Sequence, residues 1–311
     1  MSTMGILSRD ARHYRSLLEQ QNLAELQLVF AETDPAKVID YAQVDILLAD
    51  PDLAASIIEQ CTSLKWLQST WAGNAPLLRL SKCDYHLCGI KDVFGMSMRE
   101  YVFAYLLHFS RNVQGFANCQ KTCQWQAPAF TQLHAKTLGI MGVGSIGKIV
   151  AKTAKCFDMQ VHGLTYSSRD CPDVDRYFAI GDEQAFAAKL DYLVCLLPDT
   201  SNTQGIINQS FLAALPAHCV LINAGRGPAI DELALRLALN NNKLRAAVLD
   251  VFTQEPLPSE HPFWQTANLH ITQHTAAISK PEDIHQIFLD NYHRDHQDLP
   301  LKYQMDFAKG Y

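Results

Sequence analysis

Residues 136–157 read KTLGIMGVGSIGKIVAKTAKCF, and this stretch decides the fold class of the chain. An apolar run leads into a G-x-G-x-x-G loop with glycines at Gly142, Gly144 and Gly147, followed by a segment whose apolar residues have helical spacing. A second apolar run lies at 160–166, within the roughly 30 residues that one β-α-β unit occupies. The order strand, glycine loop, helix and strand predicts a Rossmann dinucleotide-binding unit.

The three glycines have separate roles in such a loop. Gly142 permits the tight turn, Gly144 lets the backbone approach a pyrophosphate, and Gly147 allows close packing of helix against strand. The pyrophosphate is expected at the N-terminus of the following helix, where unpaired N–H groups and the helix dipole favour an anion. Ser145 and Ile146 complete the predicted loop contacts. The alternative is a glycine-rich turn with a purely structural role.

The end of the second strand bears on the choice between NAD and NADP. A fold specific for NAD normally has an acidic residue there for the ribose hydroxyls, whereas this chain has Thr165. Ser167, Ser168 and Arg169 follow, and two hydroxyls with a guanidinium suit a 2′-phosphate. NADP is therefore the preferred cofactor. NAD stays open as the alternative, because Asp170 is able to pair with Arg169 or to accept from the ribose.

The rest of the chain alternates apolar runs with helical patterns, which predicts an α/β protein with two doubly wound parallel-sheet domains. We expect a Rossmann domain over 101–276, inserted in a flavodoxin-like substrate domain made of 1–100 and a C-terminal helix in 277–311. One long helix is expected from about Ser97 to Gln120. The expected strands are 4–8, 26–32, 45–50, 64–70 and 85–92, then 136–141, 160–166, 192–199, 219–225, 245–252 and 268–274; the expected helices of the first hundred residues are 13–21, 35–42 and 51–61.

Composition limits the classes of protein and partner. Hydrophobic residues make up 48% and charged residues 19%, which argues against disorder. The net charge is −6, from 26 basic and 32 acidic residues, so no basic field attracts nucleic acid. Arg9 interrupts the N-terminus before a signal peptide's apolar core, and the apolar stretch 101–109 is too short to cross a bilayer. A cytoplasmic protein that contacts no membrane is expected.

The nine cysteines are an odd number without a C-x-x-C pair, which indicates reduced thiols and not a disulfide framework. Cys119 and Cys123 have the spacing of half a metal site, but no second pair of ligands follows at a suitable distance. No metal is expected.

Three later stretches each begin as an apolar run and then reach one ionisable side chain. They are LINAGRGPAID (221–231) with Arg226, LDVFTQEPL (249–257) with Glu255, and ITQHTAA (271–277) with His274. Because parallel strands end along one edge of their sheet, these side chains are expected on the edge that also carries the glycine loop.

A guanidinium, a carboxylate and an imidazole at one edge suit the reduction of a 2-keto acid. Arg226 can hold the substrate carboxylate and polarise its carbonyl, and His274 can protonate the alkoxide that hydride transfer leaves. Glu255 is expected to stabilise the protonated imidazole. Each residue alone has an ordinary structural reading, and His270 competes for the histidine role. His274 is preferred because it falls at the strand's end, while His270 lies inside the strand.

The order of these motifs, with STWAGNAPLL (69–78), LLPDTSNTQGIIN (196–208) and MREYVFAYLLHFSR (98–111), resembles the D-isomer-specific 2-hydroxyacid dehydrogenase family. The length and the E-Y-V segment are most similar to its glyoxylate/hydroxypyruvate reductase A branch. The resemblance implies an NAD(P)-dependent reductase of a small 2-keto acid. It also implies a homodimer, formed through the apolar and aromatic segment 101–130.

The resemblance also assigns residues. The backbone N–H groups of Ala72 and Gly73 are implied as a second contact to the substrate carboxylate, and Asp250 as the residue that orients the nicotinamide amide. Further cofactor contacts are implied at Leu197, Pro198 and Ala224. The chain departs from the family pattern at Gln273, where proline is usual, and at Asn74, where an apolar residue is common.

Two other functions compete with this one. A dehydrogenase for a bulkier D-2-hydroxy acid differs only in the size of its pocket. A nucleotide-sensing binding protein, as among the carboxy-terminal-binding-protein corepressors, has long extra tails, and here the chain stops soon after its last expected helix. Formate oxidation is disfavoured, since that branch pairs its histidine with glutamine where this chain has Glu255.

Overall fold

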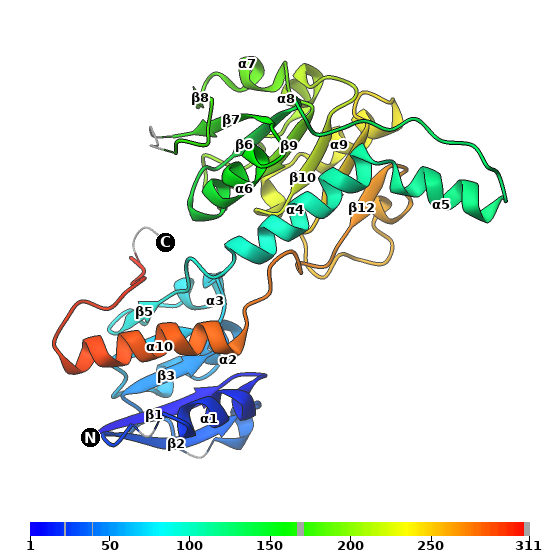
Figure 1. Cartoon of the computed structure of the whole chain (residues 1–311). Coiled ribbons are helices and arrows are strands. Elements are labelled where there is room, and N and C mark those ends of the chain that lie inside the picture. The colour runs from blue at the N-terminus through cyan, green and yellow to red at the C-terminus, as the bar shows by residue number, and fades with distance from the viewer. Residues whose placement is uncertain (22, 39, 167–170, 308–311) are drawn as a thin grey trace. The chain divides into compact units, whose positions relative to one another are not determined.

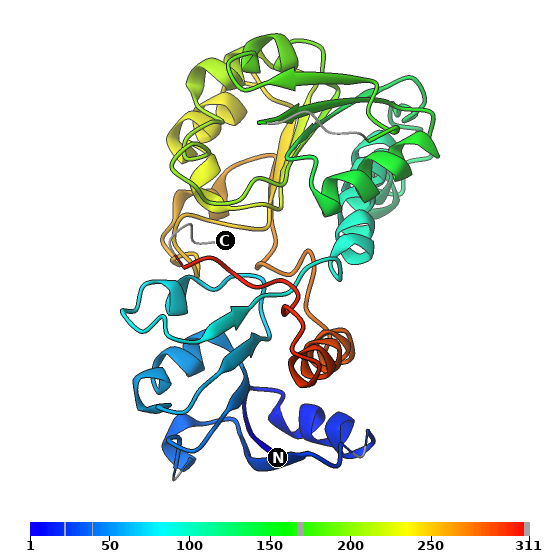
Figure 2. The same cartoon turned by 90° about the vertical axis from the view of Figure 1, so that its left-hand side faces the viewer.

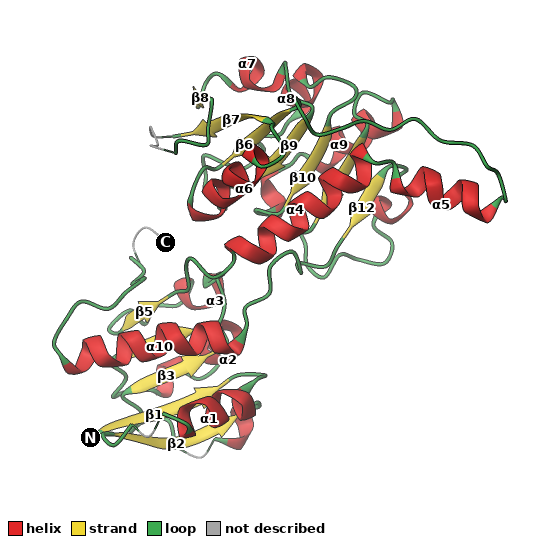
Figure 3. Cartoon of the chain, viewed as in Figure 1, coloured by secondary structure: helices red, strands yellow, loops and turns green. Residues whose placement is uncertain are grey.

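The computed structural model describes residues 1–21, 23–38, 40–166 and 171–307. It divides into two compact units, Met1–Val93 with Ser279–Tyr311, and Phe94–Ile278. Figure 1 shows strands and helices in both units, and Figure 3 distinguishes them by colour. None of the described helices is long and apolar enough to cross a membrane.

The first unit is built on a parallel sheet of five strands in the order β2-β1-β3-β4-β5. The strands are β1 Ser2–Leu7, β2 Leu26–Glu32, β3 Ile46–Ala49, β4 Trp66–Ser69 and β5 His86–Cys88. The helices are α1 Ala11–Glu19, α2 Pro51–Ala55, α3 Ala75–Leu78 and α10 Pro281–His296, with the 3-10 turns η1 Pro35–Lys37 and η2 Ile58–Gln60.

Burial of this sheet on both faces explains its continuous apolar strands. All four residues of β3 and all four of β4 are buried, as expected where helices cover a parallel sheet on both sides. The C-terminal helix α10 packs beside α1 (Figure 2), and its Phe288 ring stacks on Trp66 of β4 with the ring centroids 5.5 Å apart. The end of the chain therefore completes the core of the unit that the beginning of the chain starts.

The second unit has a parallel sheet of seven strands in the order β12-β11-β10-β9-β6-β7-β8. Its strands are β6 Thr137–Met141, β7 Gln160–Thr165, β8 Arg176–Ala179, β9 Tyr192–Cys195, β10 Val220–Asn223, β11 Ala246–Leu249 and β12 Leu269–Ile271. Its helices are α4 Gly95–Ser110, α5 Val113–Lys121, α6 Ser145–Lys155, α7 Glu183–Ala187, α8 Gln209–Ala214 and α9 Glu232–Asn240, with the 3-10 turns η3 Gly227–Ala229 and η4 Pro262–Gln265.

Helices cover both faces of this sheet as well. Phe186 of α7, Phe211 of α8 and Leu235 of α9 belong to one apolar cluster, whereas Phe103 of α4 and Val150 of α6 belong to another. Because strands β9, β10 and β11 are buried between the two clusters, their residues are apolar almost without interruption. The polar residues that follow these strands are thereby placed at the sheet's carboxyl edge.

Several elements differ from the expected ones: α3 was not expected, and the helix expected at 51–61 is divided into α2 and the 3-10 turn η2. Strand β8 was not expected. The long helix expected to Gln120 is wrong, because Asn112 adopts a left-handed conformation, with φ 51°, and separates α4 from α5. The helix expected at 35–42 is also wrong, since its described residues form only the short turn η1. The expected domain boundary at residue 100 falls inside α4, whereas the compact units divide after Val93.

Candidate active site

The glycine loop joins β6 to the N-terminus of α6 and has the close contacts that its pattern predicts. Gly142 has a φ of +94°, and a Cβ at Gly147 would lie 2.4 Å from the Gly142 carbonyl oxygen. At Gly144, by contrast, nothing lies within 4 Å of where a Cβ would be. Strand, loop and helix are thus tightly packed except at the position where the motif brings a pyrophosphate close to the backbone. These residues fit a dinucleotide.

Other predicted cofactor residues lie at the same edge. Thr165 ends β7, and Leu197 and Pro198 follow β9. A Cβ at Gly225 would lie 2.7 Å from the Leu197 carbonyl oxygen, so the chain after β10, which includes Ala224, runs directly beside the chain after β9. The predicted phosphate-binding residues Ser167, Ser168 and Arg169 lie outside the described residues.

Arg226 leaves β10 beside the loop that follows β11. A Cβ at Gly227 would lie 1.9 Å from the carbonyl carbon of Phe252, which brings the two loops into direct contact. The Arg226 guanidinium donates from Nη1 to the Gly225 carbonyl oxygen at 2.7 Å. Among the described residues no carboxylate lies within ion-pair distance of it. Arg226 is therefore a half-buried cation with donors left for an anionic ligand.

The structure brings Glu255 and His274 together, as the sequence predicts. The His274 Nδ1 atom lies 2.8 Å from Glu255 Oε2, while Glu255 Oε1 accepts the backbone N–H of Phe252 at 2.9 Å. An ionised carboxylate accepts hydrogen bonds and cannot donate them. The His274 Nδ1 atom therefore carries the hydrogen of this pair, and Nε2 is left for another partner. The His274 side chain is 52% exposed and that of Glu255 35%.

Asp250 organises the loop that carries His274. Its side chain is 2% exposed, and its two carboxylate oxygens accept the backbone N–H groups of Thr275 at 2.9 Å and Ala276 at 3.1 Å. Thr272 Oγ1 donates to Asp250 Oδ1 at 2.5 Å, and the His274 N–H donates to the Asp250 carbonyl oxygen at 2.8 Å. This carboxylate has structural partners, and its contact with a nicotinamide amide stays a prediction.

His270, the competing histidine, has a different environment. It lies in β12 with its ring centroid 5.2 Å from that of Phe109 and 6.2 Å from that of Tyr105. Burial, followed by the nearby His108, lowers the pKa of His270. His270 therefore packs within an aromatic cluster, whereas His274 is paired with a carboxylate.

The first unit carries the other predicted substrate contacts, in the loop after β4. Ala72 and Gly73 are exposed, and neither backbone N–H group donates a hydrogen bond within the part of the chain that the structure describes. Asn74, next in sequence, is buried instead, and its Nδ2 atom lies 3.5 Å from the Trp71 carbonyl oxygen. Asn74 therefore points back into the unit, and the two N–H groups before it are free to bind a carboxylate.

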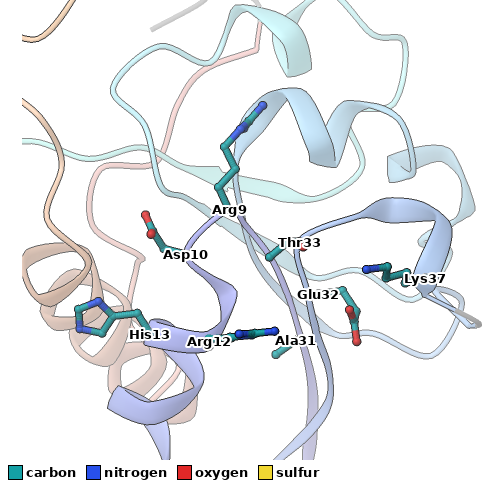
Figure 4. A pocket seen from close by; sticks show the side chains of 8 residues that line it. All are labelled: Arg9, Asp10, Arg12, His13, Ala31, Glu32, Thr33 and Lys37. Atoms are coloured by element: carbon teal, nitrogen blue, oxygen red, sulfur yellow. The ribbon is translucent and has the colours of Figure 1, made fainter.

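A separate cavity of about 390 Å³ lies beside the start of α1 and the end of β2 (Figure 4). Two of its lining residues are paired within the protein: Arg9 pairs with Asp50 at 3.0 Å and also with Asp52, and His13 lies 3.0 Å from Glu282. No residue predicted to be catalytic lines this cavity, and we do not assign the active site to it.

The family is settled by comparison with known proteins. The model for the NAD binding domain of D-isomer specific 2-hydroxyacid dehydrogenases matches residues 103–276. The glyoxylate/hydroxypyruvate reductase A of Klebsiella pneumoniae (strain 342) is 32% identical over 217 residues, which cover 70% of this chain and 70% of that protein. The chain belongs to the D-isomer specific 2-hydroxyacid dehydrogenase family. It is an NAD(P)-dependent enzyme, and the predicted family is confirmed.

Solved structures of family members share the fold of this dehydrogenase. One from Aeromonas salmonicida subsp. salmonicida A449 is 37% identical, with a TM-score of 0.94 over 98% of this chain and 99% of that one. The NADPH-dependent glyoxylate/hydroxypyruvate reductase of Sinorhizobium meliloti, solved with NADP and sulfate, is 27% identical with a TM-score of 0.89 and full coverage of both chains. The predicted fold class, α/β with two parallel sheets and a Rossmann fold, is confirmed.

Proposed function

We propose that this dehydrogenase reduces a small 2-keto acid, of the glyoxylate or hydroxypyruvate type, to the D-2-hydroxy acid with NADPH. The observation that carries the proposal is the 2.8 Å contact between His274 and Glu255, on the same sheet edge as Arg226, which has no ion-pair partner among the described residues. The glycine loop, with Ser145 and Ile146 at the start of α6, would hold the dinucleotide. The bound nicotinamide would supply the hydride.

Arg226 would bind the substrate and stabilise charge during the reaction. Its fork of N–H donors is able to reach the substrate carboxylate and the carbonyl oxygen together. Negative charge grows on that oxygen as hydride arrives, so a fixed cation stabilises the transition state more than the ground state. The Ala72 and Gly73 N–H groups are our prediction for further contacts to the carboxylate, since neither donates a hydrogen bond among the described residues.

His274 would supply the proton. With Nδ1 held by Glu255, its Nε2–H is the donor left for the developing alkoxide, and the carboxylate stabilises the imidazolium before the proton leaves. Glu255 itself is fixed by the Phe252 N–H, so the imidazole has one preferred orientation. This division of roles needs no metal ligand from the chain.

Substrate size is tested by following NADPH oxidation with keto acids of increasing side-chain volume. Relatives named glyoxylate/hydroxypyruvate reductase A support a small substrate. We expect kcat/KM to be highest for glyoxylate or hydroxypyruvate and to fall as the side chain grows. A maximum at a bulky aliphatic or aromatic keto acid would support the alternative, a dehydrogenase for larger D-2-hydroxy acids.

Cofactor preference gives a second prediction. The reductase from Sinorhizobium meliloti was solved with NADP, and a family member from Xanthobacter autotrophicus Py2 with NADPH. Replacing Arg169 by alanine should raise the KM for NADPH about ten- to a hundredfold, the effect of losing a charge-assisted contact to the 2′-phosphate. The KM for NADH serves as the control and should barely change. Equal losses with both cofactors would show that Arg169 does not read the phosphate.

We also propose that the enzyme is a homodimer formed through 101–130. Helix α5 extends away from the sheet of its unit in Figure 1, and the segment exposes Phe116 and Trp125. Light scattering should give twice the chain mass of 34.8 kDa. The double substitution Phe116→Glu and Trp125→Glu should produce monomers. Leu237→Glu, at an exposed apolar position on α9, is the control and should leave the dimer intact. A monomeric wild-type protein at micromolar concentration would contradict this proposal.

A further inference from the structure

A chain of hydrogen bonds connects helix α4 to the loop that carries His274. The Tyr101 hydroxyl of α4 lies 2.9 Å from Thr272 Oγ1, and Thr272 Oγ1 lies 2.5 Å from Asp250 Oδ1. Tyr101 and Thr272 are 171 residues apart in sequence. Both residues lie in stretches that carry the family resemblance, 98–111 and 271–277, but the proposed chemistry gives neither side chain a role.

The direction of these bonds follows from counting donors. Thr272 has one hydroxyl hydrogen, and the acceptor carboxylate of Asp250 takes it, so Tyr101 must donate to Thr272 Oγ1. Burial raises the pKa of Tyr101 and outweighs the opposing effect of its hydrogen bond to Thr272, so its hydroxyl keeps the hydrogen that it donates. The chain therefore runs from Tyr101 through Thr272 to Asp250.

The loop at the end of this chain has a conformation that requires support. His274 has a φ of +56°, in the left-handed region that non-glycine residues seldom adopt. Asp250 holds the residues on both sides of it, through Thr272 before it and the Thr275 and Ala276 N–H groups after it. The orientation of Asp250 thus sets the backbone from which the imidazole reaches Glu255.

We propose that Tyr101 is a positioning residue for His274. It acts through Thr272 and Asp250 and fixes the loop in the one conformation that presents the imidazole for proton transfer. The inference rests on the proposed function in one respect only, that His274 is the proton donor. Without the Tyr101 hydroxyl, Thr272 keeps its bond to Asp250 but loses the donor that fixes its hydroxyl oxygen from the other side.

The first test compares Tyr101→Phe with Tyr105→Phe. Tyr105 lies one turn further along α4 with its ring centroid 5.1 Å from that of Tyr101, and its hydroxyl makes no hydrogen bond among the described residues. Tyr101→Phe should lower kcat about two- to tenfold, as expected when the loss of one hydrogen bond appears in the barrier. The solvent deuterium isotope effect on kcat should increase while the Kd for NADPH is unchanged. Tyr105→Phe should match the wild type.

A second pair of variants tests the middle of the chain. Thr272→Val removes the hydroxyl at nearly constant volume and should lower kcat further than Tyr101→Phe, whereas Thr272→Ser should restore most of the rate. Adding Tyr101→Phe to Thr272→Val should have no further effect, because the two residues act in series. Full additivity of the two effects would contradict the proposed chain.

Hydrogen–deuterium exchange provides a reading that needs no substrate. Tyr101→Phe should speed exchange in a peptide covering 272–277 and leave exchange in peptides from β9 and β10 as in the wild type. If the substitution destabilised the whole unit, exchange would rise in all three peptides. If Tyr101→Phe behaves like Tyr105→Phe in both kcat and exchange, the inference is wrong. An enzyme that reduces no keto acid would overturn the proposed function, and exchange would still decide whether Tyr101 holds the loop.

Discussion

Replacing Arg226 by lysine should lower kcat/KM for the keto acid by about a hundredfold or more. Lysine keeps the charge but presents one compact ammonium group, which cannot bind a carboxylate and a carbonyl oxygen in the planar arrangement of a guanidinium. Losing one preorganised donor to a developing oxyanion typically costs two to three orders of magnitude in rate. Arg226 forms no ion pair with the carboxylates that the structure describes, and its donors other than the one bound to Gly225 are available for that role.

The control for this substitution separates binding of the cofactor from binding of the substrate. The Kd for NADPH should be unchanged in Arg226→Lys, because the guanidinium is assigned to the keto acid. Arg236→Lys, at a partly buried arginine on α9, should leave both quantities as in the wild type. Turnover close to the wild-type value in Arg226→Lys would exclude the proposed clamp.

Removing the His274 imidazole should lower the rate of reduction about 10²- to 10⁴-fold, the usual contribution of a general acid. The loss in His274→Ala should extend over the whole pH range, because no donor remains in place. His270→Ala is the matched control. His270 is half-buried in an aromatic cluster, so its removal should affect stability more than the rate of reduction.

Glu255→Gln tests the coupling between the two residues and should behave differently from His274→Ala. In the proposed mechanism the carboxylate at 2.8 Å orients the imidazole and stabilises its positive charge, and glutamine keeps the shape without the charge. kcat/KM should therefore fall in Glu255→Gln, but by less than in His274→Ala, which loses the proton donor itself. Adding Glu255→Gln to His274→Ala should cause no further loss, and full additivity of the two losses would show that the residues are not coupled.

Much of the fold could be predicted because its strands are buried on both faces. Runs such as YLVC in β9 and VLIN in β10 stay apolar over their full length, and turn residues end them. Strand β8 was missed because Arg176–Ala179 is short and lies at the sheet's edge, where only Phe178 is buried. Burial on both faces, and not intrinsic propensity, is thus the signal that the sequence carried most clearly.

The break between α4 and α5 illustrates what local patterns cannot show. Residues on either side of Asn112 continue a helical pattern. Its left-handed conformation is stabilised by a side chain that caps α5 at the Gly115 N–H and also donates to the Ala129 carbonyl oxygen. The second of these bonds spans 17 residues, so no helical periodicity predicts it.

The candidate active site also contains some residues whose role the sequence predicts and others whose role it does not. Arg226, Glu255 and His274 could be predicted because each follows an apolar strand, and the ends of parallel strands share one edge. The bonds of Asp250, Thr272 and Tyr101 depend on how α4 packs against β12, which no spacing in the sequence encodes. Sequence patterns therefore predicted the groups proposed for chemistry. The resemblance named Asp250 only as a nicotinamide contact, and no pattern assigned a positioning role to Asp250, Thr272 or Tyr101.

The configuration of the product is the decisive measurement for the proposed reaction. Wild-type enzyme is incubated with hydroxypyruvate and NADPH, and the glycerate is resolved by chiral chromatography while NADPH oxidation is measured. A keto acid held by Arg226 and protonated by His274 presents one face to the hydride, so a single enantiomer should form in an amount equal to the NADPH consumed. The D-isomer specificity of the family makes D-glycerate the expected product. L-glycerate, a mixture of both isomers, or NADPH oxidation without glycerate would contradict this prediction.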